Sequence, residues 1–253
     1  KKEVKDINDS TETDLGEWQK DADHDFNDQV LFRLTGTLPE NYATYTSYEY
    51  IFHDTMSKGL TFDPASVEIY HGDEKTGTKI DANNYTVSNQ SGTDGKTEIT
   101  IQFANLKTAV SATFGDKITV VYKATLNENS VIGSEGNPNK VYLEFSNNPN
   151  GNGTGKTPED TVTVFTYKVA ANKVDGDGKK LSKFDMKNNR WELVGYQNVK
   201  LDASGNLVET DGRYEVESAT ATSFAWNRID DGKYKLEEVV TPAGYNTIDP
   251  VEF

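Results

Sequence analysis

The chain has no cysteine, no long apolar run and a shortage of basic charge. The absence of cysteine from all 253 residues excludes disulfides and thiolate metal sites. No apolar run is long enough to span a bilayer, and the opening residues 1–6 do not form a signal peptide, so any targeting segment of a secreted form is expected outside this chain. With 26 basic against 41 acidic residues, the net charge is −15. Such a polyanion is repelled by nucleic acid and by anionic lipid, and we expect neither as a partner.

Patterns typical of cofactor sites are also scarce. The three histidines are scattered without metal-ligand spacing, and neither a Gly-rich phosphate loop nor a Ser-His-Asp arrangement is present. Alternating carboxylates over residues 21–28 offer the oxygen ligands that calcium takes. That loop lacks the glycine and the bidentate glutamate of an EF-hand, so a solvated loop is favoured and calcium stays an open alternative. We expect no cofactor.

Short alternating runs rich in β-branched and aromatic residues make up most of the chain. The 13 Tyr and 11 Phe supply much of the apolar material, which is only 34% of the sequence, at a mean hydropathy of −0.72. Residues 29–35, 97–103 and 117–123 are predicted strands, separated by Gly- and Asn-rich turns. Regularly spaced short strands of this kind predict an all-β fold built from sandwiches.

The composition changes once, in the Asn- and Gly-rich stretch 147–158, which we interpret as a loop. Strand character resumes at 161–169, and this strand is expected to end the first domain and lead directly into the second. The predicted domains are residues 1–168 and residues 169–253. The second has its own strand candidates, including 191–194, 213–216 and 233–239.

Three polar residues are candidates for one site, and two of them lie in patterns that place them in a core. Lys2 shares a strand face with Val4, and Asn147 continues the alternating apolar row 141, 143 and 145. Asp54 lies between them in sequence. A lysine is rarely buried without a partner, and a buried carboxamide needs hydrogen-bond partners. The bland alternatives are a solvated terminal lysine, a turn asparagine and an ordinary turn cap at Asp54.

If a sandwich brings these three side chains together, burial permits a specific reaction. Desolvation lowers the pKa of the amine and raises that of the acid, so the amine becomes a neutral nucleophile and the acid keeps its proton. Attack on the asparagine forms an amide and releases ammonia, while the acid shuttles protons. Fixed positions can contribute on the order of 7–11 kcal/mol. The reaction happens once, so this chain would crosslink itself and not turn over a substrate.

Longer stretches resemble a known family. Residues 54–62 and 136–149 resemble signature stretches of the middle domain of Gram-positive backbone pilins. Lys173, followed much later by residues 234–245, resembles the opening lysine and the E-box of a CnaB domain. The matches occur in the family's order over nearly the whole chain.

The resemblance implies a shaft subunit of a sortase-assembled, cell-wall-anchored extracellular pilus, whose partners are other pilin subunits. It implies tandem Ig-like sandwiches with Lys–Asn isopeptide bonds. In the first domain it assigns Lys2, with Lys1 as the alternative, together with Asp54 and Asn147. In the second it assigns Lys173 and Glu238.

The second domain departs from the family pattern. Val239 follows Glu238 where the E-box has threonine, and residues 181–184 lack the usual Gly-Ala pair. Glu237 is adjacent, but alternation points it to the opposite face. The asparagine partner is expected on a final strand beyond the E-box, so we expect this domain to be truncated; Asn246 is a poor candidate. Two other functions stay open: an ancillary pilin or adhesin that binds host glycan or matrix, and a carbohydrate-active enzyme with paired carboxylates.

Overall fold

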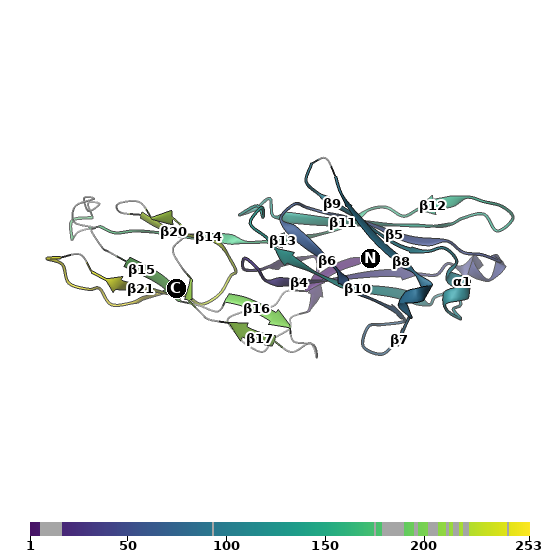
Figure 1. The fold of residues 1–253 in the computed structure, drawn as a ribbon, viewed down its shortest axis with the longest axis horizontal. Coiled ribbons are helices and arrows are strands. Elements are labelled where there is room, and N and C mark those ends of the chain that lie inside the picture. Colours follow the sequence, from purple (N-terminus) through teal and green to yellow (C-terminus); the bar gives the residue numbers. More distant parts are fainter. Residues whose placement is uncertain are drawn as a thin grey trace.

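The computed structural model is an elongated molecule with two β-rich lobes end to end (Figure 1). It describes residues 1–5, 17–92, 94–174, 176–178, 190–194, 197–201, 207–210, 213–214, 218–219, 223–241 and 243–253. Among these residues no helix is long and apolar enough to cross a membrane. The two-sandwich, all-β architecture is the one that the sequence predicts.

The first lobe is a sandwich of two sheets, which we call the β1 sheet and the β11 sheet. The β1 sheet has the order β2 (Trp18–Gln19), β1 (Lys2–Lys5), β4 (Gln29–Thr37), β10 (Lys117–Leu126), β6 (Leu60–His71) and β7 (Thr78–Lys79). The β11 sheet has the order β3 (Asp21–Asp23), β13 (Asp160–Phe165), β11 (Asn137–Ser146), β5 (Tyr50–Met56), β9 (Thr97–Phe103) and β8 (Thr86–Ser91), with β12 (Thr154–Lys156) paired to β11. Short helical turns are η2 (Glu40–Thr44), η3 (Ala82–Asn84) and α1 (Leu106–Ala109).

Alternation of side chains decides which face of each strand enters the core. Strand β4 alternates between buried and half-buried positions over its whole length, and β10 does the same from Val121 onward. The two sheets approach closely at Gly36, where a Cβ atom would lie 2.0 Å from the Tyr50 hydroxyl oxygen. Glycine at this position therefore lets a large side chain of the β11 sheet pack against β4. The three strands predicted at 29–35, 97–103 and 117–123 are confirmed as β4, β9 and β10.

The second lobe is thinner and has a smaller described core. Its strands are β14 (Tyr167–Asn172), β20 (Ser223–Ile229) and β19 (Ser218–Ala219) in one sheet; β18 (Arg213–Tyr214), β15 (Arg190–Val194), β21 (Lys235–Val240) and β22 (Val251–Glu252) in another; and the pair β16 (Gln197–Leu201) and β17 (Leu207–Thr210). The buried apolar residues described here are Trp191, Leu193, Phe224, Trp226, Ile229 and Tyr234. Residues 181–184 lie outside the described part.

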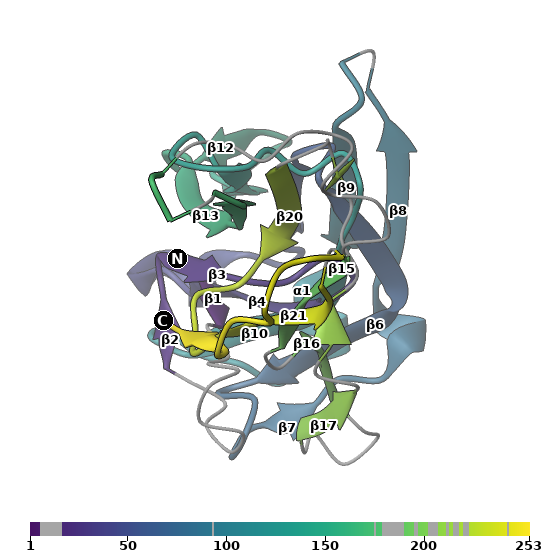
Figure 2. The same cartoon turned by 90° about the vertical axis from the view of Figure 1, so that its left-hand side faces the viewer.

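Only Thr166 separates the last strand of the first sandwich, β13, from the first strand of the second, β14. The change of sheet therefore falls close to residue 168, where we expect the domain boundary. Figure 2, along the long axis, shows the second lobe in front of the first. The lobes are joined by backbone hydrogen bonding from Phe26 N to Arg228 O at 2.8 Å, and by Asp230 N donating to Asp25 Oδ1 at 2.9 Å.

Candidate functional site

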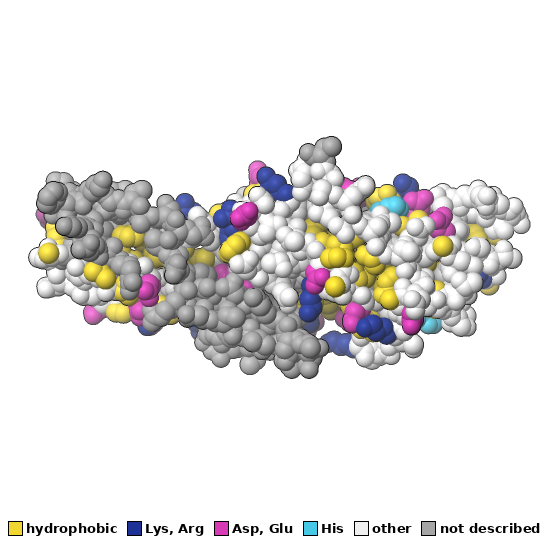
Figure 3. Space-filling model, in the orientation of Figure 1, with side chains coloured by type: hydrophobic (Ala, Val, Ile, Leu, Met, Phe, Trp, Pro, Cys, Tyr) yellow, Lys and Arg dark blue, Asp and Glu magenta, His cyan; other side chains and the backbone are white. Residues whose placement is uncertain are grey.

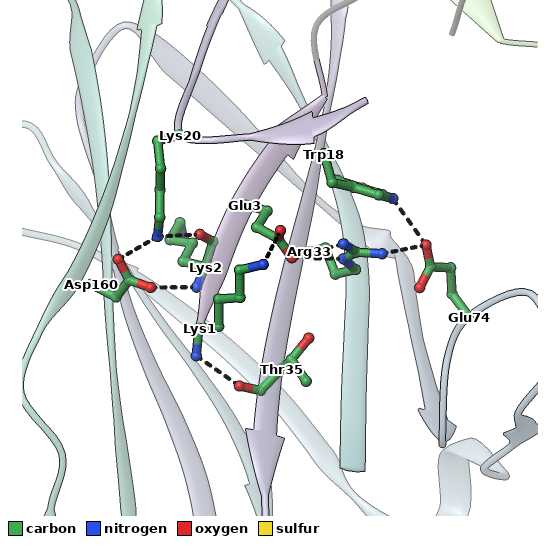
Figure 4. A network of polar contacts seen from close by, with 9 residues as sticks. All are labelled: Lys1, Lys2, Glu3, Trp18, Lys20, Arg33, Thr35, Glu74 and Asp160. Carbon is green, nitrogen blue, oxygen red and sulfur yellow. Dashed lines mark hydrogen bonds and ion pairs between the residues drawn. The ribbon is translucent and has the colours of Figure 1, made fainter. Parts of the chain in front are cut away.

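The side chain of Lys2 points into the core of the first sandwich. Lys2 pairs with Leu34 of β4 and is fully buried, while its neighbour Glu3 points the other way and accepts from Arg33 at 2.8 and 3.0 Å (Figure 4). Alternation along β1 produces this division, as the sequence predicts. The side chain of Lys1 is 60% exposed and pairs with Glu3 at 2.5 Å. Lys2, and not Lys1, is therefore the buried amine.

Lys2 Nζ forms a fully buried ion pair with the Asp54 carboxylate. The Tyr122 hydroxyl lies 3.0 Å from both groups: it accepts from Lys2 Nζ and donates to Asp54 Oδ2. The sheets share the site, because β1 and β10 carry Lys2 and Tyr122 while β5 carries Asp54. The structure thus brings together two of the three predicted groups and adds a phenol.

A buried carboxamide completes this cluster, and it belongs to Asn139. This residue is fully buried on β11, and its Nδ2 donates to the Tyr122 hydroxyl at 2.8 Å. Strand pairing sets Asn139 opposite Met56, and Val141, two residues along the same face, opposite Asp54. The Tyr122 hydroxyl therefore contacts the amine, the acid and the carboxamide. These contacts use the one donor and both acceptor sites of the hydroxyl.

The expectation that Asn147 lies in the core is wrong. Asn147 is exposed, just past the end of β11, and its Nδ2 donates to Thr154 O at 2.9 Å across the β11–β12 hairpin. Asn139 and Asn147 belong to the same alternating row, but only the Asn139 end of that row lies between the sheets. Burial along the row decreases toward Asn147, since Leu143 and Phe145 are only half-buried.

Sequence reasoning also missed Tyr122. It lies on the row Ile118, Val120, Tyr122 and Ala124, whose members are all buried. A tyrosine in such a row is most often ordinary core, and its ring does stack on Phe32 with centroids 5.3 Å apart. The available signal was the hydroxyl itself, because a buried phenol needs a polar partner inside the core.

Burial changes the proton affinities of the cluster. It lowers the pKa of Lys2 to about 8, although the neighbouring Asp54 carboxylate opposes the shift. Burial likewise raises the pKa of Asp54, against the opposing effect of Lys2. It also raises that of Tyr122, which keeps the phenol protonated. Both shifts in the Lys2–Asp54 pair favour a neutral amine beside a neutral acid.

Two oxygens of the cluster accept no hydrogen bond from any described residue: Asp54 Oδ1 and Asn139 Oδ1. Buried oxygens without donors are costly. A proton on the Asp54 carboxyl could be donated to the Asn139 carbonyl. The arrangement can therefore supply a nucleophile, an acid and an electrophile in a site where aromatic rings, including Phe32 at 5.4 Å from Lys2 Nζ, replace water.

The second lobe contains a simpler pair. Lys173 Nζ lies 3.0 Å from Glu238 Oε1, both residues are buried, and the amine is 5.2 Å from the Trp191 ring centroid. Glu237 pairs instead with Lys235 at 2.6 Å. Lys173 and Glu238 thus meet, while Asn246 is exposed.

The acidic segment 21–28 takes part in the junction between the lobes. Asp21–Asp23 forms β3, which pairs in parallel with β13, and Asp25 accepts from the second lobe. Carboxylate oxygens of Asp23, Asp230 and Asp231 lie within 4.8 Å of one another, with Asp230 buried. Calcium on residues 21–28 stays an open alternative to the expected solvated loop.

Comparison with known proteins shows which family the chain resembles. Residues 30–149 match the sequence model of the Gram-positive pilin backbone subunit 2, Cna-B-like domain. This region is similar to the Gram-positive backbone pilins. The chain is 28% identical over 230 residues to the trypsin-resistant surface T6 protein of Streptococcus pyogenes serotype M6, a match that covers 86% of this chain and 39% of that protein.

Solved backbone pilins share the fold. The T6 backbone pilin of S. pyogenes is 23% identical with a TM-score of 0.60, covering all of this chain and 50% of that one. The 35 kDa C-terminal fragment of the major pilin GBS80 of Streptococcus agalactiae is 17% identical with a TM-score of 0.63, covering 100% and 90%. Domains D2 and D3 of the major pilin SpaD of Corynebacterium diphtheriae are 20% identical with a TM-score of 0.55, covering 100% and 88%. This chain therefore spans half or less of the T6 protein.

Proposed function

We propose that this chain is part of the shaft subunit of a Gram-positive surface pilus, extracellular and linked to other copies of the subunit in a polymer. The match to backbone pilins supports this role, and the two lobes set end to end suit a rod section. The job is structural. The chemistry in the chain serves its own crosslinking and acts on no separate substrate.

The proposal includes an amide bond between Lys2 and Asn139, with Asp54 as the acid–base group. The single observation that carries it is the Tyr122 hydroxyl, which holds the amine, the acid and the carboxamide at 2.8–3.0 Å in a fully buried site. Proximity of this kind is the largest contribution available to such a reaction, about 7–11 kcal/mol.

The step balances within these groups. The pair passes its proton from Lys2 Nζ to Asp54, and the neutral amine attacks Cγ of Asn139 while the acid donates to Oδ1. The tetrahedral centre collapses with a second proton, from Nζ, delivered to Nδ2, so the C–N bond of the carboxamide breaks and ammonia leaves. The proton that Oδ1 received then returns to Asp54, so the products are a secondary amide, ammonia and a protonated Asp54, and the net charge of the site stays at zero.

In the second lobe, Lys173 and Glu238 are proposed as the amine and the acid of a corresponding site. The CnaB resemblance and the 3.0 Å contact support these two roles. The asparagine that such a site needs is not assigned.

The test is intact mass spectrometry of the purified chain and of two matched variants. Asn139→Ala should have the mass of its unmodified sequence, because the electrophile is gone. Asn147→Ala should still be lighter by one ammonia, because that side chain lies on the surface. A wild-type mass equal to that of the unmodified sequence would refute the crosslink, and loss of the bond in Asn147→Ala alone would refute the assignment to Asn139. Tandem mass spectrometry of the joined peptides then identifies the residues.

A further inference from the structure

The main chain of Lys2 is held by an ion pair that lies outside the reacting cluster (Figure 4). Lys2 N donates to Asp160 Oδ2 at 2.7 Å, and Lys2 O accepts from Lys20 Nζ at 2.6 Å. The two side chains also contact each other, with Lys20 Nζ 2.5 Å from Asp160 Oδ1. The Lys2 backbone, the Asp160 carboxylate and the Lys20 ammonium therefore each contact the other two. Together the two side chains hold both the N–H and the C=O of Lys2.

The position of these contacts follows from strand pairing. Lys1 exchanges backbone hydrogen bonds with Thr35 of β4, at 2.7 Å and 2.8 Å, so the N–H and C=O of the next residue, Lys2, point away from β4. On that side lies β13 of the opposite sheet, which carries Asp160. The ion pair therefore joins β1 to the β11 sheet at the residue that bears the amine.

Asp160 is also tied to the strand of the electrophile. It pairs in register with Val141 of β11, two residues from Asn139 on the same strand. The separation of Lys2 from Asn139 across the sandwich is thus set from the backbone side by Asp160, and from the side-chain side by Tyr122. Burial would raise the pKa of Asp160, but the bonds from Lys20 and from Lys2 N lower it, so it stays an anion suited to this contact.

An apolar cleft of about 360 Å³ opens beside this ion pair. Phe52, Val141 and Leu143 line it, with Lys1 and Asp160 at its wall. The cleft lies on the side of the first sandwich that faces away from the viewer in Figures 1 and 3, as the position of the N-terminus in Figure 2 shows. Lys2 is nevertheless fully buried. Asp160, one member of the ion pair, therefore lies between this cleft and a reaction that needs a dry site.

We propose that Lys20 and Asp160 are positioning residues for bond formation: together they fix the Lys2 backbone against the β11 sheet and close the site on its cleft side. This inference rests on the proposed Lys2–Asn139 bond. The ion pair does not touch the reacting atoms. Its effect is on the distance of attack and on the exclusion of water.

The charges of Lys20 and Asp160 have opposite effects on the pKa of the Lys2 amine, so removing one charge or the other should change the pH dependence of bond formation in opposite directions. Asp160 raises the pKa of Lys2 and Lys20 lowers it, while Asp54 and Tyr122 are the polar groups that contact the amine from the other strands. The reacting pair needs one shared proton, which it loses as the pH rises through about 8. The rate of bond formation should therefore fall above that pH.

The experiment follows ammonia loss in time. Unfolded, uncrosslinked chain is isolated in denaturant, diluted into buffers across a range of pH, quenched with acid and weighed by intact mass spectrometry. Asp160→Ala and Lys20→Ala should each form the bond at least about 10-fold more slowly than the wild type, since a misplacement near 1 Å can cost about 100-fold. The alkaline fall should move to lower pH in Asp160→Ala and to higher pH in Lys20→Ala.

Three further variants separate positioning from folding. Asp160→Asn keeps an acceptor for Lys2 N and should be faster than Asp160→Ala with the same direction of pH shift. Lys20→Arg should restore both rate and pH profile. The double variant Lys20→Ala with Asp160→Ala should be slow with a nearly normal profile, and circular dichroism during refolding should show the strands returning at the wild-type rate in every case.

Each outcome of this experiment tests a different part of the proposal. If the wild type never loses ammonia, the proposed crosslink itself fails. If the wild type reacts and the alanine variants react equally fast, the crosslink stands and the positioning role is overturned. Slow variants whose pH profiles do not move, or whose strands return as slowly as the bond forms, would assign the ion pair to general folding and would also overturn the inference.

Discussion

Each sandwich buries one lysine against one acid, and the two differ in what surrounds the pair. In the first, both side chains are fully buried, and Tyr122 connects them to the carboxamide of Asn139. In the second, Lys173 is 8% exposed, and beside the Glu238 contact the described surroundings of its amine are the Trp191 ring. A buried amine and acid are thus two parts of a reactive site. In the proposed reaction, the bridging phenol and the carboxamide supply the parts that the pair of the first sandwich would need to react.

The largest expected effect comes from removing the acid of the first sandwich. Asp54→Ala should leave the fold and block the bond, which would close a loop containing more than half of the chain. Without this covalent loop, the free energy of unfolding should fall by about 5 kcal/mol, and the melting temperature should fall by roughly 10–20 °C. Differential scanning calorimetry and trypsin digestion measure this, with the exposed Asp63→Ala as the control. Unchanged melting and protease resistance in Asp54→Ala would assign the acid role to another residue.

The next effect tests whether the phenol is what sets the first site apart. Tyr122→Phe keeps the ring stacked on Phe32 but removes the hydroxyl that joins the three reactive groups, so bond formation should slow by about 100-fold. The matched control is Tyr48→Phe, because Tyr48 is equally buried and its hydroxyl has no hydrogen-bond partner among the described residues. Time courses of ammonia loss are the measurement. Equal rates in the two variants would leave the hydroxyl with a packing role only.

The smallest effect is expected in the second sandwich. Glu238→Gln keeps a hydrogen-bond acceptor for Lys173 but removes the charge, so stability should fall by about 1–3 kcal/mol. Calorimetry on a chain that keeps Asp54 measures the change, and Glu237→Gln, whose partner Lys235 is only half-buried, is the control. If Glu238→Gln lowers the stability as much as Asp54→Ala does, the two Lys–acid pairs do not differ as their surroundings indicate.

The fold and half of the first site could be predicted from the sequence, through alternation and through the family resemblance. Lys2 faces inward as its alternation with Val4 indicates, Asp54 is the acid that the family resemblance assigns, and the strands at 29–35, 97–103 and 117–123 form. Alternation gives the face of a residue but not its depth along the strand. Which end of the Asn139–Asn147 row enters the core depends on how β11 pairs with β5, and this register is set by contacts between distant segments.

The remaining members of the site have little local signal beyond the hydroxyl of Tyr122. Tyr122 resembles any core aromatic, and its role appears only when three strands meet at its hydroxyl. Lys20 and Asp160 are far apart in sequence, and each is an ordinary charged residue in a chain rich in charge. Their meeting at the Lys2 backbone is a product of the topology that sets β1 beside β13.

The single residue between β13 and β14 gives the molecule a direct route for tension. A pull on the second lobe enters β13 through Thr166 without an intervening linker, and β13 is bonded along its length to the strand that carries Asn139. With Asn139 joined to Lys2, that pull would pass on to β1 through a covalent link, and the strands beyond β5 and β4 would carry none of it. Stretching such a rod would then strain its junctions before it unravelled its first sandwich.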